Sequence, residues 1–159
     1  MKRDELAACL GPDNKIYAIG GYGGGDNACL SSAERFDPLT GKWEIIASMK
    51  EARRALAAVA LPDGIYAIGG YNGKEYINTV EKYDFFTNEW TIIKPMNTPR
   101  CTLAAVASTD CQYIYVVGGF NGTPLNSIER YNVTNEEWEC DIPQMNQKRF
   151  MHSCIMVNL

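Results

Sequence analysis

The sequence has little of what nucleic-acid-binding and membrane-spanning proteins require. Its 159 residues carry 15 lysines and arginines against 19 aspartates and glutamates, a formal net charge of −4, so no excess of cations is available for phosphates. There is no apolar run approaching the roughly 20 residues of a membrane helix, and no charged-then-apolar leader that ends in small residues. We therefore predict neither a nucleic-acid partner nor a membrane partner.

Histidine and paired cysteines are also scarce. His152 is the only histidine, and none of the six cysteines belongs to a C-x-x-C motif, so a zinc site of the usual spacing is not expected. Cysteines scattered in this way are typical of a reducing compartment rather than of a secreted disulfide framework. We predict an intracellular, cytoplasmic protein that holds no metal and needs no cofactor.

Signals for catalysis are equally weak. A Ser-His-Asp or Cys-His arrangement would depend on His152 alone. The stretch from Gly23 to Ala28 matches the spelling G-x-G-x-x-A, but no helix pattern follows it, and a phosphate loop works by presenting the amino terminus of a helix. We predict that the chain is not an enzyme.

What the chain does contain is a threefold internal repeat of about 48 residues, in a composition typical of a single globular domain (46% apolar, 21% charged). The Gly-Gly pairs recur every 49 residues, each after an Ile-Tyr run. An acidic-basic-aromatic triplet, a tryptophan seven residues after its aromatic, and a Met-x-x-x-Arg step follow in the same order. These landmarks are Gly20-Gly21, Gly69-Gly70 and Gly118-Gly119; Glu34-Arg35-Phe36, Glu81-Lys82-Tyr83 and Glu129-Arg130-Tyr131; Trp43, Trp90 and Trp138; Arg53, Arg100 and Arg149.

Each repeat is predicted to form four short strands. The run 56–61 has no polar alternation, which indicates a strand buried on both faces. The Ile-Tyr run before each Gly-Gly pair favours a second strand. Alternation over 79–83 indicates a half-exposed third strand, and the tryptophan begins the fourth. Four strands per unit and no helical period favour propeller blades.

The ordered landmarks resemble the Kelch repeat, and the resemblance covers essentially the whole chain. It implies an all-β fold of Kelch β-propeller blades, each of four antiparallel strands. Arg3 and Arg149 fit the arginine position of the repeat, while Phe36 and Asn132 depart from its usual Tyr-Asp pair. The implied units are three complete blades at about 3–49, 50–96 and 97–145, and an extra first strand of a next blade at 146–159.

The repeated residues have structural roles in this interpretation. Glycine tolerates the positive φ that a tight backbone approach requires, so the Gly-Gly pairs are predicted to be structural. The three tryptophans and the aromatics Phe36, Tyr83 and Tyr131 are predicted to fill the wedges between blades. We further expect charge-assisted bonds to join blades. The residues involved are Arg53, Arg100 and Arg149, with backbone carbonyls or Glu34, Glu81 and Glu129 as acceptors.

The resemblance also implies a binding surface. In Kelch proteins that bind peptides, contacts come mainly from residues just after the glycine pair and just after the repeat arginine. Tyrosine and arginine are frequent binding hot spots, although the aromatics could instead simply cap the blade ends. The matching positions are Tyr22, Tyr71, Phe120, Asn72 and Asn121 after the pairs, and Arg54, Cys101 and Phe150 after the arginines.

We therefore expect a protein-protein interaction module that binds a partner protein or peptide through the loops at one end of the propeller channel. Kelch proteins that resemble this one often act as substrate receptors of cullin-type ubiquitin ligases. The alternatives are an actin or cytoskeletal scaffold and, disfavoured by the lone histidine, a galactose-oxidase-like copper enzyme.

Three blades are fewer than the roughly four to eight of a closed propeller. The chain is accordingly predicted to be half of a six-bladed ring. It would be either a piece of a longer protein or one half of a homodimer.

Overall fold

The computed structural model describes residues 2–25 and 28–157, which form twelve β-strands and no helix. Each sequence repeat folds into one four-stranded antiparallel sheet in which consecutive strands are neighbours. The first sheet contains β1 (Ala7–Leu10), β2 (Ile16–Ile19), β3 (Ala33–Asp37) and β4 (Lys42–Ile46). The second contains β5 (Ala57–Leu61), β6 (Gly64–Ile68), β7 (Val80–Asp84) and β8 (Glu89–Ile93). The third contains β9 (Ala104–Ala107), β10 (Tyr113–Val117), β11 (Ile128–Asn132) and β12 (Glu137–Glu139).

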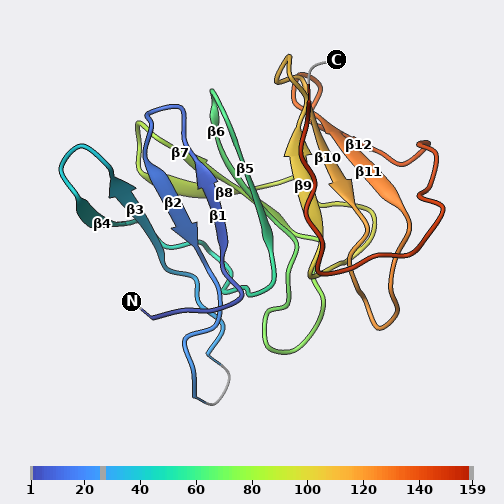
Figure 1. The fold of residues 1–159 in the computed structure, drawn as a ribbon, viewed down its shortest axis with the longest axis horizontal. Helices are drawn as coiled ribbons and strands as arrows, with labels where there is room; N and C mark the ends of the chain where they lie inside the picture. Colours follow the sequence, from blue (N-terminus) through green and yellow to red (C-terminus); the bar gives the residue numbers. More distant parts are fainter. Residues whose placement is uncertain (1, 26–27, 158–159) are drawn as a thin grey trace.

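The three sheets stand side by side like blades (Figure 1). The first strands of successive sheets, β1, β5 and β9, are neighbours in space and lie along the inner side of the array. This arrangement confirms the expected all-β architecture of four-stranded antiparallel blades. The described residues form an open array, with no sheet that closes it into a ring.

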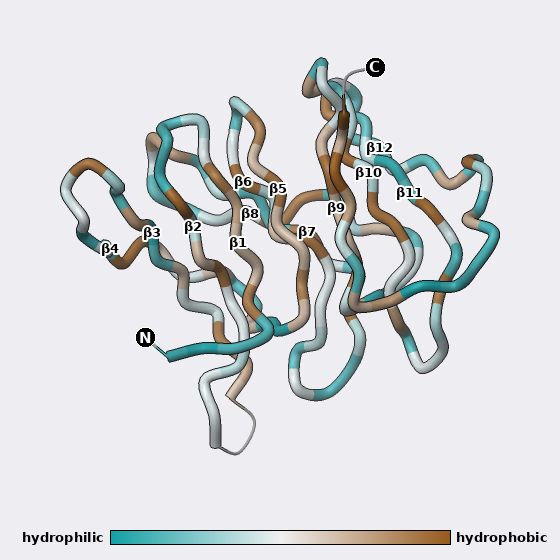
Figure 2. Tube along the Cα trace, in the orientation of Figure 1, coloured by the Kyte–Doolittle hydropathy of each residue, from teal (hydrophilic) through white to brown (hydrophobic). Residues whose placement is uncertain are grey.

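Apolar side chains gather between the blades. Figure 2 shows many of the apolar residues on the strands, and some connecting loops also carry them. A fully buried cluster lies between the first and second blades, where Tyr17 and Ile19 face Ile65 and Tyr83. A second cluster lies between the second and third blades, around Val80 and other apolar residues. Burial of these faces contributes roughly 25 cal/mol per Å² of apolar area, so the blades stabilise one another.

Trp90 and Trp138 attach their blades to the preceding blade through hydrogen bonds. Trp90 is 1% exposed, and its indole N–H donates to the carbonyl of Ala47 on the preceding blade at 2.8 Å. Trp138, which is half-buried, repeats this bond with the carbonyl of Lys94, also at 2.8 Å. Trp43 is 53% exposed, so the prediction that it fills a wedge is wrong for the described residues. Its wedge needs a preceding sheet, and the described residues form none before the first blade.

The expected extra strand at 146–159 is not formed. Residues 146–157 contain no strand, and residues 158–159 of that prediction lie outside the described residues. The segment nevertheless starts like the next blade, because Gly119 N–H donates to Arg149 O at 2.8 Å and Met151 N–H donates to Thr102 O at 2.9 Å. Beyond this point Ile155 is 83% exposed. A first strand needs a second strand for its ladder, and the described chain supplies none.

Trp90 and Trp43 form a matched pair for a stability test. We expect Trp90→Ala to lower the free energy of unfolding by about 3–5 kcal/mol, because it opens a cavity between two blades. Trp43→Ala should lower it by less than about 1.5 kcal/mol, because a half-exposed ring loses less burial. Urea unfolding followed by circular dichroism measures both. Equal losses for the two variants would contradict this view of blade packing.

Candidate functional site

The repeat brings two sets of predicted residues together at one end of the blades. In each of the three blades, the residue after the repeat arginine pairs through its backbone with the residue after the Gly-Gly pair. Arg54 and Tyr71 exchange N–H···O bonds of 3.0 and 2.9 Å, and Cys101 and Phe120 exchange two of 2.9 Å. The two sequence positions that the resemblance singled out are therefore structural neighbours in the second and third blades.

Beside these pairs, residues in the left-handed backbone conformation form a series of hydrogen bonds that we call the inter-blade ladder. Glu5, Ala55, Thr102 and Met151 all have φ between 48° and 52°. The amide of Ala55 donates to Glu5 O at 2.8 Å, Thr102 to Ala55 O at 2.7 Å, and Met151 to Thr102 O at 2.9 Å. Because these bonds cross between successive units, the inter-blade ladder fixes the spacing of the backbone pairs around the inner strands.

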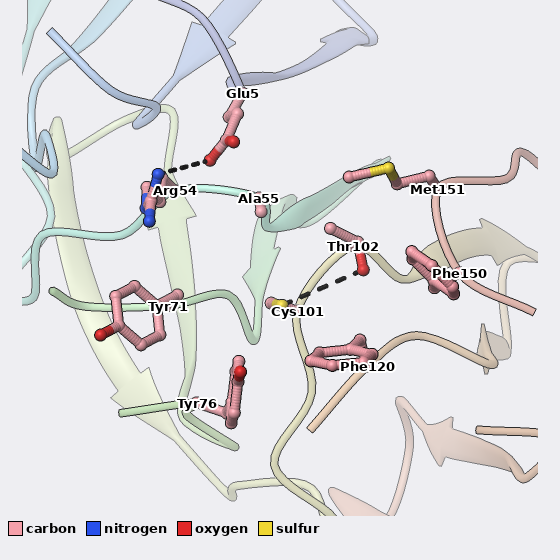
Figure 3. Close-up of a pocket in the computed structure, with 10 residues that line it drawn as sticks. All are labelled: Glu5, Arg54, Ala55, Tyr71, Tyr76, Cys101, Thr102, Phe120, Phe150 and Met151. Carbon is pink, nitrogen blue, oxygen red and sulfur yellow. Dashed lines mark hydrogen bonds and ion pairs between the residues drawn. The ribbon is translucent and has the colours of Figure 1, made fainter. Parts of the chain in front are cut away.

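A pocket of about 510 Å³ is lined by the residues of this ladder and by their neighbours (Figure 3). Five of the eight predicted contact residues line it, from the second blade, the third blade and the C-terminal segment. These are Arg54, Tyr71, Cys101, Phe120 and Phe150. The remaining lining residues are Glu5, Ala55, Tyr76, Thr102 and Met151.

One side of the pocket is a continuous row of four rings, Tyr71, Tyr76, Phe120 and Phe150, which we call the aromatic wall (Figure 3). Successive ring centroids are 5.5, 5.7 and 5.6 Å apart, and Tyr76 meets Phe120 edge-on. Such contacts hold rings in place beyond their area of burial. Phe150 is still 44% exposed, so the wall presents apolar surface to solvent.

Arg54 supplies the positive charge of the pocket. Its guanidinium lies 5.3 Å from the ring centroid of Tyr22 and 5.2 Å from that of Tyr71, so two cation–π contacts hold it. It also pairs with the Glu5 carboxylate, at 3.3 Å from Nη1 to Oε2. The side chains of Arg54 and Glu5 are 34% and 43% exposed, and such pairs contribute only about 0–1 kcal/mol.

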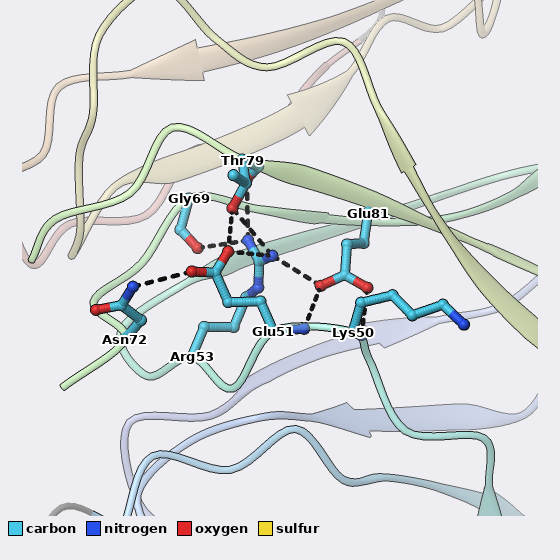
Figure 4. A network of polar contacts seen from close by, with 7 residues as sticks. All are labelled: Lys50, Glu51, Arg53, Gly69, Asn72, Thr79 and Glu81. Carbon is cyan, nitrogen blue, oxygen red and sulfur yellow. Dashed lines mark hydrogen bonds and ion pairs between the residues drawn. The ribbon is translucent and has the colours of Figure 1, made fainter. Parts of the chain in front are cut away.

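The neighbouring Arg53 has a different role, because its side chain is fully buried and ties the loops in place (Figure 4). It donates to the carbonyls of Gly69 at 3.0 Å and Thr79 at 2.9 Å, and to Glu81 Oε1 at 2.8 Å. The Glu81 carboxylate also accepts the amides of Lys50 and Glu51, at 2.6 and 3.0 Å. These bonds, which we call the arginine clamp, anchor the linker that leads into the second blade.

The same clamp recurs in the third blade. Charge-assisted bonds thus form at two of the three predicted arginines, but each lies within a single blade, so the prediction that these bonds join blades is wrong. Buried Arg100 donates to Gly118 O at 2.8 Å and to Glu129 Oε1 at 2.6 Å. Glu34 is paired with Arg3. The prediction is wrong for Arg149, whose side chain is exposed, because the described residues contain no fourth blade to supply its acceptors.

The glycine pairs allow this clamp to close. Gly69 has φ of +60°, and a Cβ there would lie 2.6 Å from the carbonyl oxygen of Arg100 in the next blade. Gly70 donates its amide to the same oxygen at 2.9 Å. No side chain fits such an approach, which explains why glycine occupies these positions.

The other three predicted residues lie outside the main pocket. Tyr22 lines a smaller hollow of about 240 Å³ with Cys29 and Arg54, and Asn121 lines one of about 450 Å³ beside Tyr76. The side chain of Asn72 points toward Glu51 (Figure 4). Its amide donates to Glu51 Oε1 at 2.9 Å, and its oxygen accepts the amides of Lys74 and Glu75 at 3.0 Å. Asn72 therefore shapes the 71–76 loop.

Sequence reasoning missed Tyr76 and the left-handed residues. Tyr76 pairs with Tyr71 across its loop, as Cys29 pairs with Tyr22 and Pro124 with Phe120. Because these positions recur at 47 and 48 residues, the repeat spacing could have revealed Tyr76. The left-handed residues likewise stand two positions after each repeat arginine, but their side chains share no chemistry that would mark them.

The two cysteines of this region behave as apolar lining. Burial raises the pKa of the Cys101 thiol above its usual value, and it does the same for Cys29. The Cys29 thiol donates to Tyr71 O at 3.4 Å. Both thiols are therefore protonated near neutral pH, which leaves little thiolate for nucleophilic chemistry.

Within 2–25 and 28–157, no three His, Cys, Asp or Glu side chains gather as metal ligands would. Burial, with a smaller effect of Arg149, lowers the pKa of His152, which lies on the C-terminal segment. None of the described residues forms a helix of the length and apolarity needed to cross a membrane.

These blades, with their repeated clamp and a pocket built from adjacent loops, define a protein of the β-propeller type. A family model described as the KLHDC2/KLHL20/DRC7 Kelch-repeats domain matches residues 1–159. The chain belongs to the Kelch-repeat family.

Individual relatives match shorter segments. Kelch-like protein 5 of Homo sapiens is 49% identical over 47 residues, 30% of this chain and 6% of that protein. Kelch-like protein 28 of Homo sapiens is 38% identical over 83 residues, 48% of this chain and 14% of that protein. An F-box/kelch-repeat protein of Arabidopsis thaliana is 38% identical over 63 residues, 40% of this chain and 16% of that protein. The matches thus span only 6 to 16% of these relatives.

Proposed function

We propose that the chain binds a peptide segment of a partner protein in the pocket at the loop end of its blades. The observation that carries this proposal is the aromatic wall, in which rings from two blades and the C-terminal segment line one open cavity with Arg54. Membership of the Kelch-repeat family supports an interaction module in general. A rigid scaffold that displays loop side chains is a common basis for such binding.

A partner is expected to bind here because exposure of the rings of the aromatic wall to water raises the free energy of the unbound chain. Aromatic rings and an arginine are the side chains that most often dominate interface energies, especially when a partner excludes water from them. In this pocket the rings already contact one another, so little conformational entropy is lost when a ligand packs against them. A preformed aromatic pocket with one charged group suits a short extended segment.

A finer role follows from the relatives. We propose that the bound partner is a substrate presented to a cullin-type ubiquitin ligase, with the rest of the receptor supplied outside the region described. Support comes from the family and from relatives named Kelch-like proteins and an F-box/kelch-repeat protein.

We also propose a cytoplasmic location, supported by six cysteines that are all free thiols.

We propose in addition that a further Kelch blade covers the open face of the first blade, either from a second copy or from a longer chain. Support comes from Trp43, which stands where Trp90 and Trp138 bond to a preceding blade but is 53% exposed. Leu10, which is 63% exposed, lies in the same cross-strand row of this sheet as Trp43, through Ile16 and Phe36. Contiguous apolar faces of this kind mark interaction surfaces in soluble proteins.

The 159-residue chain alone provides the test of this second proposal. We expect light scattering at high concentration to report dimers or larger species, because the exposed blade face associates. Trp43→Glu should shift the population toward monomer by placing a charge in that face. A stable 17.7 kDa monomer at all concentrations would contradict association.

The pocket itself is tested with peptides selected against the wild-type chain from a phage-displayed library. Tyr71→Ala and Phe120→Ala should each weaken binding at least about tenfold, since hot-spot truncations cost about 2 kcal/mol or more. The melting temperature should change by only a few degrees, because both rings are partly exposed. Phe86→Ala is the control, since this ring in the β7–β8 turn is 97% exposed and outside the pocket. Unchanged binding in the two pocket variants would refute the proposal.

A further inference from the structure

The sequence contains two Asn-Gly dipeptides, and both fall in the loops that follow a Gly-Gly pair. They are Asn72-Gly73 in the second blade and Asn121-Gly122 in the third, 49 residues apart. Glycine has no side chain to hinder approach to its backbone nitrogen, so an asparagine before glycine readily loses its side-chain amide. The repeat therefore places two chemically matched sites in equivalent loops.

The reaction at such a site needs only water. The backbone nitrogen of the glycine gives up its proton and bonds to the side-chain carbon Cγ of the asparagine. The Cγ–Nδ2 bond breaks, and the nitrogen leaves with the proton as ammonia. Water then opens the five-membered imide at one of its two carbonyl carbons, which leaves aspartate or isoaspartate. One water is consumed, one ammonia is released, and nothing is oxidised or reduced.

The side chain of Asn72 is restrained against this reaction. Its Nδ2 donates to Glu51 Oε1 at 2.9 Å, and its Oδ1 accepts the amides of Lys74 and Glu75, each at 3.0 Å. Closing the imide ring swings Cγ onto the nitrogen of Gly73, so these bonds must open before the attacking geometry forms. Asn72 is therefore protected by its own surroundings.

Asn121 lacks this restraint, and the sequence shows why. The position of Glu51, two residues before the repeat arginine, is Thr98 in the third blade, which has no carboxylate to accept the amide. The position of Glu75, three residues after the asparagine, is Pro124, which has no N–H to donate. Across the described residues, no protein group is hydrogen-bonded to the Asn121 side chain.

The attacking nitrogen is accessible in the same loop. Gly122 is exposed, and a Cβ built on it would meet no atom within 4 Å. In the part of the chain that the structure describes, no carbonyl accepts its amide. The Gly122 peptide can therefore turn towards the Asn121 side chain without breaking a bond to another blade.

The product changes one edge of the pocket. Asn121 lines the hollow of about 450 Å³ beside Tyr76, together with Lys74. The residue before it, Phe120, belongs to the aromatic wall. Aspartate at this position adds a negative charge, and isoaspartate in addition lengthens the backbone by one carbon next to Phe120.

We propose that Asn121 is a spontaneous deamidation site, which converts in the folded chain to a carboxylate at the edge of the pocket, while Asn72 in the equivalent loop is protected. The modification needs no enzyme, so it accumulates with the age of the molecule. It adds one negative charge to the formal net charge of −4.

The test follows both sites in one sample. The 159-residue chain is incubated at body temperature in mildly alkaline buffer, which favours the deprotonated attacking nitrogen. Trypsin separates Asn72, in peptide 55–74, from Asn121, in peptide 101–130, and tandem mass spectrometry with an isoaspartyl methyltransferase assay follows each. Asn121 should react at least about tenfold faster, since three bonds must open at Asn72 and each slows the reaction by about two- to tenfold.

Three controls identify the cause. In guanidinium chloride the two sites should react at similar rates, because glycine follows both. Glu51→Ala removes the acceptor of the Asn72 amide and should speed the reaction at Asn72 by about two- to tenfold, without changing that at Asn121. Glu89→Ala removes an exposed carboxylate from β8 and should change neither rate. Circular dichroism shows whether the variants keep the fold, and the comparison of folded with denatured wild type needs no variant.

The proposal is overturned by equal rates at the two sites in the folded chain, or by a slower reaction at Asn121. It is also overturned if Asn121 reacts in guanidinium chloride but not in the folded chain, because the native loop then prevents ring closure. An unchanged rate at Asn72 in folded Glu51→Ala would show that the bond to Glu51 is not the restraint, against the protection proposed.

Discussion

The structure depends on how the repeat arginines Arg53 and Arg100 are held. Each guanidinium is buried and paired within its own blade, with Glu81 for Arg53 and with Glu129 for Arg100. The carbonyl of each arginine meets the Gly-Gly pair of the blade before it, so one residue connects two sheets. Removing one partner from a buried ion pair typically costs about 3–5 kcal/mol. The arginine therefore fixes both the folding of each linker and the spacing between blades.

The proposed binding site is a consequence of that spacing. The residue after each clamp arginine pairs with the residue after the glycine pair, and the next one adopts the left-handed turn that bonds to the following blade. Side chains 49 residues apart in sequence, such as Tyr71 and Phe120, thereby reach the same pocket. Arg53 and Arg54 show the division of labour, since the buried residue builds the frame and its exposed neighbour faces the ligand.

The repeat made most of the fold predictable, because Gly-Gly, aromatic and Trp positions recur with fixed spacing and fixed geometry. Five pocket residues were also predicted by position. The exposure of Trp43 and Arg149 was not, because a repeat pattern describes a residue within an array and does not state whether a neighbouring blade stands beside it. The Arg54–Glu5 pair was missed because it joins two blades through side chains that do not recur in the repeat.

Native-state hydrogen exchange by NMR tests the central claim most directly, because it reports single backbone amides. The amides of Gly70 and Thr102 lie outside the strands but donate across to the neighbouring blade, to Arg100 O and Ala55 O. If these bonds hold the blades together, both amides are protected as strongly as those of the central strand β6, since they open only when the blades separate. Exchange as fast as that of the exposed hairpin turns would show that the blades are not joined in this way.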